Sequence, residues 1–170
     1  MVSFKQIHAS LQQNGTPAQL DYFFSQVSSK LEHSPSLRTA VSHHLIAVGD
    51  NKHAVQFLDR MLKGADKKNL SRLTAAALAA FRDGDFTRCT KFCKRIINNK
   101  GDTENAYNLL GIIDRRMNHL PQAVKKFLRG VKQNPNSFKL HHNLAITYAK
   151  MDNAEKSARE WAIAKSLKNT

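Results

Sequence analysis

Long apolar runs are absent from this chain of 170 residues. No stretch approaches the roughly 18 consecutive apolar residues that a membrane-spanning helix needs. The N-terminal segment MVSFKQIHASLQQNG also lacks the continuous apolar stretch of a secretory signal peptide. We therefore expect a cytoplasmic protein with no membrane span.

Glycine, proline and aromatic residues are also scarce. The chain has 7 glycines and 4 prolines, and aromatic residues make up 8% of it. A sheet of many short strands needs more turn-forming residues than this. The composition therefore favours a helical protein.

Only two cysteines occur, Cys89 and Cys93, four positions apart. On a helix this spacing places both on one face. The pair is not the C-x-x-C of a redox motif, and a zinc site would need two further ligands that the spacing does not offer. We expect two small apolar core residues in a reducing compartment.

Acidic residues are few, 13 against 27 Lys and Arg, which gives a formal net charge of +14. The first 34 residues are neutral, with two basic and two acidic residues, so the whole excess lies in residues 35–170. A partner of opposite charge is expected.

Turn-forming residues recur at intervals of 34 or 35. They are Gly15, Gly49, Gly84, Asn118 and Asn153. After each turn, apolar or small residues follow the i, i+4, i+7 spacing of an amphipathic helix, and the segments before the turns behave in the same way. We predict helix–turn–helix units over 1–34, 35–69, 70–103, 104–137 and 138–170, stacked into a single domain spanning 1–170.

The unit 104–137 resembles a tetratricopeptide repeat. Six of its residues fall at the spacing of that family: Tyr107, Leu110, Gly111, Ala123, Phe127 and Pro135. Asp114 departs from the pattern, which has an aromatic or aliphatic residue there. The likeness is closest over 70–170, weaker over 35–69 and weakest over 1–34, where the segment is either a divergent repeat or a plain hairpin.

The resemblance implies an all-α, right-handed superhelical array of about five hairpins. Its concave groove would be lined by the first helix of each unit. The usual work of the family is binding peptides or protein partners rather than catalysis, so we expect a non-catalytic scaffold.

The residues expected to line the groove share one helical face and include no Asp or Glu. Asparagine can hydrogen-bond a peptide backbone and arginine can grip carboxylates, which favours an acidic peptide or protein segment as the partner. The alternative is that these are ordinary solvated residues of a basic protein. The candidate partner-binding residues are Arg82, Asn105, Asn108, Arg115, Arg116, Lys139, His142 and Asn143.

Two alternative functions stay open. A second basic stripe on the outer, convex face suits nucleic acid or another polyanion, although it lacks interleaved aromatic residues for base stacking. Some bacterial response regulators carry such repeats after a receiver domain, with a similar Tyr-Asn-x-Leu-Gly-Ile run, so the chain is also compatible with a part of a larger signalling protein. The stripe comprises Arg60, Lys91, Lys94, Arg95, Lys125, Lys126, Arg129, Lys132 and Arg159.

Catalytic and metal-binding motifs are missing from the sequence. The pairs His43-His44 and His141-His142 are adjacent, so the rings of each pair diverge on a helix, and no phosphate-binding loop or G-x-S-x-G motif occurs. We expect no enzyme activity, no metal and no cofactor. The two-carboxylate clamp of the chaperone-adaptor members is also incomplete, since Lys139 and Asn143 match only parts of it, so we do not expect binding of chaperone tails.

The last predicted helix ends near Leu167 and the chain at Thr170. Tetratricopeptide arrays usually close with an extra polar helix, which is not seen here. Leu144, Tyr148 or Trp161 would then be partly exposed, which predicts either a homodimer through this end or a piece of a longer protein.

Overall fold

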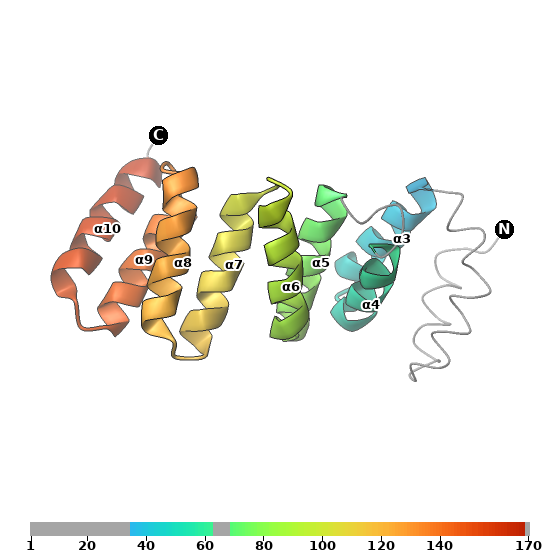
Figure 1. The fold of residues 1–170 in the computed structure, drawn as a ribbon, viewed down its shortest axis with the longest axis horizontal. Coiled ribbons are helices and arrows are strands. Elements are labelled where there is room, and N and C mark those ends of the chain that lie inside the picture. Colours follow the sequence, from blue (N-terminus) through green and yellow to red (C-terminus); the bar gives the residue numbers. More distant parts are fainter. Residues whose placement is uncertain (1–34, 63–68, 169–170) are drawn as a thin grey trace. The chain divides into compact units, whose positions relative to one another are not determined.

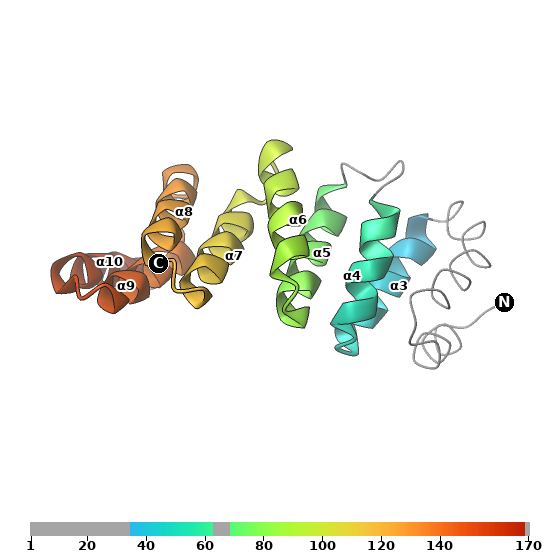
Figure 2. The same cartoon turned by 60° about the horizontal axis from the view of Figure 1, so that its bottom comes forward.

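Eight α-helices and no strand make up the described part of the computed structural model, residues 35–62 and 69–168. Figures 1 and 2 show consecutive helices joined by short turns. The predicted first hairpin, residues 1–34, lies outside the described residues. The helices are α3 (Pro35–Ala47), α4 (Asn51–Met61), α5 (Leu70–Asp83), α6 (Phe86–Asn98), α7 (Thr103–Arg116), α8 (Leu120–Gln133), α9 (Phe138–Lys150) and α10 (Ala154–Lys168).

The chain divides into two compact units, residues 1–72 and 73–170, each of which is described by itself. In the first unit α3 packs against α4. In the second unit α7 packs against α8 and α9 against α10, while α6 contacts α7 and α8 contacts α9. The helix α7 also contacts α9, the equivalent helix of the next hairpin.

The turn within each described hairpin contains one residue in the left-handed backbone region. These residues are Gly49 (φ 79°), Gly84 (φ 80°), Asn118 (φ 60°) and Asp152 (φ 55°). Glycine adopts this conformation without strain, and Asn and Asp are the other residues that tolerate it best. The turn position in the last hairpin is thus Asp152 rather than Asn153, and the period from Gly84 onward is 34 residues at both steps.

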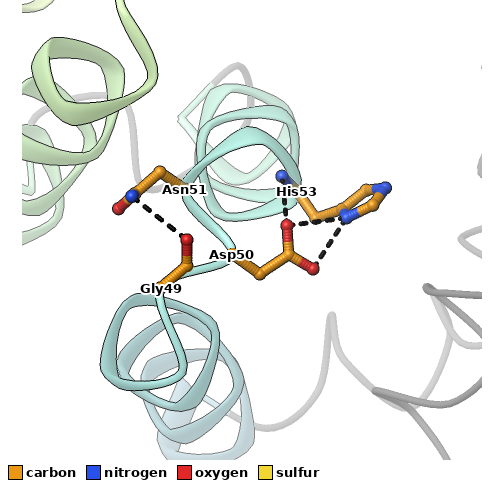
Figure 3. A network of polar contacts seen from close by, with 4 residues as sticks. All are labelled: Gly49, Asp50, Asn51 and His53. Carbon is orange, nitrogen blue, oxygen red and sulfur yellow. Dashed lines mark hydrogen bonds and ion pairs between the residues drawn. The ribbon is translucent and has the colours of Figure 1, made fainter.

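In the first unit, Asp50 fixes the start of α4 (Figure 3). Its Oδ1 accepts a hydrogen bond of 3.3 Å from the backbone N–H of His53, and both of its carboxylate oxygens lie 2.8 Å from His53 Nδ1. Asn51 Nδ2 donates to the carbonyl oxygen of Gly49 at 3.2 Å, across the turn. These bonds satisfy groups that a helix start would otherwise leave without partners.

Aspartate or serine caps the starts of three helices of the second unit, α6, α7 and α9, in the same way. Asp85 Oδ1 accepts from the backbone N–H of Arg88 at 2.9 Å, at the start of α6. Asp102 does so at the start of α7 and Ser137 at the start of α9. Most of the scarce acids near these turns therefore have a local structural role.

The core between α7, α8 and α9 depends on a close approach at Gly111. A Cβ atom added there would clash with Cε1 of Phe127, a fully buried ring. A second glycine, Gly130 on α8, has Cδ1 of Leu140 at 2.9 Å from its Cβ position. The expectation that small residues let these helices pack closely is confirmed at Gly111.

Cys89 and Cys93 are both fully buried free thiols in α6, with their sulfur atoms 4.0 Å apart. The hydrogen bond to Cys89, together with burial, raises the pKa of the Cys93 thiol above its ordinary range. The same bond lowers the pKa of Cys89. Their burial fits the predicted core role.

At the C-terminal hairpin the predicted exposure is only partly right. Leu144 is fully buried and Tyr148 is 9% exposed, because both pack in a cluster with Phe127 and Leu140. Trp161 is 44% exposed. The prediction was therefore wrong for the two α9 residues and right for the tryptophan.

Replacing Gly111 with alanine should lower the free energy of unfolding by about 1–2 kcal/mol. The overpacking against Phe127 destabilises the fold by more than the higher helix propensity of alanine stabilises it. Urea unfolding followed by circular dichroism measures the effect. In a double-mutant cycle with Phe127→Leu, the two losses should be less than additive, because the smaller side chain removes the clash. Additive losses would contradict the proposed contact.

Candidate functional site

Polar side chains one repeat apart bridge α7 and α9. Lys139 Nζ lies 3.4 Å from Asn105 Oδ1, and Asn143 Nδ2 donates to Asn108 Oδ1 at 2.7 Å. The residues of these pairs are 34 and 35 positions apart, so the repeat length itself brings them together. We call the surface formed by Asn105, Asn108, Arg116, Lys139, His142 and Asn143 the α7–α9 face.

The orientation of the two asparagine amides follows from their neighbours. Asn143 Nδ2 also donates to the carbonyl oxygen of Lys139 at 3.0 Å, and a carbonyl only accepts. The amide nitrogen of Asn143 is therefore fixed, and Asn108 must present its oxygen to it. Both amides are partly buried, and this leaves Asn108 Nδ2 as a donor and Asn143 Oδ1 as an acceptor for other groups.

Arg115 is held inside the fold rather than presented on this face. Its Nη1 donates to the carbonyl oxygen of Asn143 at 3.2 Å, and its guanidinium carbon lies 5.9 Å from the centre of the Phe127 ring. Burial, with a further effect of the neighbouring Arg116, lowers the pKa of Arg115. The structure thus gives this predicted site residue a bridging role between α7 and α9.

Arg116 is exposed, but it also has intramolecular contacts. Its guanidinium carbon lies 4.7 Å from the ring centre of Phe81 and 5.8 Å from that of Phe86. These cation–π contacts orient the charge at the C-terminal end of α7. Arg82, at the end of α5, is also exposed.

His142 is part of an aromatic cluster on the last hairpin. Its ring lies 5.4 Å from that of Phe138 and meets Trp161 edge-on at 4.8 Å. The predicted site did not include Trp161. The sequence signal that could have identified it was its place as a large apolar residue near the predicted open C-terminal end of the array. Its neighbour His141 faces the other way, with Nδ1 at 2.6 Å from Glu160 Oε2 and Nε2 at 3.0 Å from the carbonyl oxygen of Pro135.

Two acids that the sequence pattern missed lie beside the α7–α9 face, Asp102 and Glu104, and Glu104 Oε1 accepts a hydrogen bond of 2.8 Å from the Ser137 hydroxyl. Asn105 Nδ2 donates to Asp102 Oδ2 at 2.6 Å, because Asp102 caps α7 just before the helix begins. The face was predicted from positions within the helix, and a cap residue such as Asp102 lies before the first of them. The positive character of the face is therefore weaker at the N-terminal end of α7 than at its C-terminal end.

A model of the tetratricopeptide repeat matches residues 126–159, which run from α8 through α9 into α10. The hairpins, their turns and the close approach at Gly111 agree with this match. This stretch of the chain is therefore similar to a tetratricopeptide repeat. No curated protein matches the chain in sequence.

Several solved structures share the fold of this chain. The MamA RS-1 ArsTM double mutant is 17% identical with a TM-score of 0.72, and the match covers 98% of this chain and 93% of that one. MamA residues 41 to the end from Desulfovibrio magneticus RS-1 give 16% identity, a TM-score of 0.72 and the same two coverages, 98% and 93%. Another MamA crystal structure gives 14%, 0.71, 92% and 93%. The predicted fold class, an all-α array of tetratricopeptide-like hairpins, is confirmed.

Within 35–62 and 69–168, no group of three or more His, Cys, Asp or Glu residues is placed to hold a metal ion. No helix in the same ranges is long and apolar enough to cross a membrane. Whether residues 1–170 form a single domain stays a prediction.

Substituting Arg115 with alanine should destabilise the protein by about 1 kcal/mol, since the hydrogen bond to the Asn143 carbonyl and the contact with the Phe127 ring are both lost. The same change at the exposed Arg82 should cost much less. Equilibrium unfolding in urea compares the two variants. Equal stability of both would show that Arg115 is an ordinary solvated residue.

Proposed function

We propose that the protein is a non-catalytic scaffold that binds an extended, acidic segment of another protein on the α7–α9 face. The observation that carries this proposal is the Asn108–Asn143 pair. The donor and the acceptor that it leaves unused are the complement of a peptide group, which offers one carbonyl oxygen and one N–H. A backbone in extended conformation would therefore bind there without depending on a particular side chain.

The charges around the pair support an acidic partner. Lys139 and Arg116 are both exposed on this face, and Arg82 lies exposed at the end of α5. Asp102 occupies the N-terminal end of α7, where it would repel an acidic side chain. We therefore place the acidic residues of the partner toward Arg116, whose guanidinium is oriented by Phe81 and Phe86.

A polyanion such as nucleic acid is the second candidate, and it would bind the outer helices. The sequences of α6 and α8 contain four Lys or Arg residues each and no Asp or Glu. In that case binding would weaken steeply with salt, because phosphate contacts release counterions. The predicted homodimer and the place in a larger bacterial signalling protein stay predictions.

Replacing Asn108 and Asn143 with alanine together should weaken binding of acidic, extended peptides about tenfold or more, because at least one backbone hydrogen bond is lost. The single change Lys139→Glu should also weaken binding, but only the binding of acidic peptides. The measurement is binding of the purified chain to an array of acidic, neutral and basic peptides.

The control for this experiment is Lys125→Glu, which makes the same charge change on α8. It should leave peptide binding within about twofold of the wild type, since long-range charge effects are screened at physiological salt. If the asparagine variant and Lys139→Glu bind acidic peptides as well as the wild type does, the proposed site is wrong. Loss of DNA binding in Lys125→Glu, with peptides ignored by all variants, would favour the second candidate.

A further inference from the structure

A second hollow lies where α6 borders the C-terminal end of α7, and one of its lining residues, Phe86, has the Arg116 guanidinium 5.8 Å from its ring centre. It is an open groove of about 960 Å³ within the unit 73–170. In Figure 1 the two helices lie next to each other. We call it the α6–α7 groove.

One wall of the groove is basic. The residues of α6 that line it include Lys91, Lys94 and Arg95, and both lysines are exposed. The carboxylate in the lining, Asp85, is engaged, since it caps α6 and lies 3.4 Å from Nη1 of Arg88. The fixed charge presented by this wall is therefore positive.

Beside the polar residues Thr87, Thr90 and Asn98, the lining contains three large apolar side chains. Ile113 lies on α7, Met117 follows it directly after the helix, and Phe86 begins α6. Met117 is 56% exposed, the largest value among the exposed large apolar side chains of the described residues. Methionine is flexible and polarisable, so it adapts well to the surface of a partner.

The groove also has a length that suits a helix. Its α6 residues run from Phe86 to Asn98, which corresponds to about 18 Å along the helix axis, or between three and four helical turns. An amphipathic helix of this length has apolar residues at i, i+3, i+4 and i+7 that fit a hydrophobic groove. Its other side would face the lysines.

We propose that the α6–α7 groove is a second protein-docking site, for an acidic amphipathic helix of a partner. The apolar side of that helix packs on Phe86, Ile113 and Met117, and acidic residues along its edge pair with Lys94. The two sites differ in what they recognise, since the α7–α9 face offers amide groups to an extended backbone. This inference does not depend on the α7–α9 face being a binding site.

A polyanion alone fits the groove less well. Phosphate groups would pair with the lysines but would leave the apolar side chains in contact with water, so Met117 would contribute nothing to binding. An acidic amphipathic helix uses both features. Dependence of binding on Met117 therefore distinguishes the two ligands.

The test uses a fluorescein-labelled peptide of about 14 residues, four helical turns, with leucines along one side and glutamates along the other. Fluorescence anisotropy at about 0.15 M salt measures its binding to the full chain and to variants. Lys94→Glu and Met117→Glu should each weaken binding about tenfold or more. Met117→Leu, which keeps an apolar side chain, should bind like the wild type.

Three controls make the result specific. Lys125→Glu changes the net charge equally, and the Asn108/Asn143 double-alanine variant removes the amide pair of the other face, so both should bind normally. A peptide of the same composition with the leucines scrambled should bind at least about tenfold more weakly. Far-UV circular dichroism shows whether each variant is folded.

The proposal is overturned if the peptide fails to bind the wild-type chain, or if Met117→Glu binds it as well as the wild type does. It is also overturned if a short DNA duplex binds more tightly than the peptide and only the lysine variants affect it, since the groove would then be a polyanion site. Loss of binding in the asparagine variant alone would assign the peptide to the α7–α9 face instead.

Discussion

The contact of Gly111 with the Phe127 ring sets the distance between α7 and α8, and much of the second unit follows from it. Nothing larger than a hydrogen atom fits between the backbone of α7 and that ring. Phe127 in turn packs in one cluster with Leu140 and Leu144 of α9. The position of α9 beside α7 therefore depends on the absence of a side chain at one residue of the chain.

The polar bridges between α7 and α9 are a consequence of this packing. Once equivalent helices lie side by side, residues one period apart come into contact, as Asn108 and Asn143 do. The two amides then fix each other's orientation, and the groups that they leave unused are determined before any partner arrives. Such preorganisation lowers the entropic cost of binding.

The sequence correctly predicted the helices and turns, which follow from periodicity. It did not predict the contacts of long side chains or of residues outside the periodic pattern. The bounds of α7 and α9, the turn residues and the role of Gly111 follow from spacing and steric size. Arg115 was predicted to line the groove, yet its flexible side chain reaches back to a carbonyl of α9, which no helical projection shows. Asp102 was not predicted because it precedes the helix. The α6–α7 groove was not predicted because its lining residues come from two different helices.

The charge of the chain is a poor guide to its function until the neighbours of each cation are known. Arg115 is used by the fold and Arg116 rests on two phenylalanines, whereas Lys139 lies beside an asparagine amide and Lys94 beside apolar groups. All four contribute equally to the net charge. We propose that Lys139 and Arg116 serve an extended acidic segment and Lys94 an acidic helix. The two partners would then be distinguished by the shape of their backbone rather than by their charge.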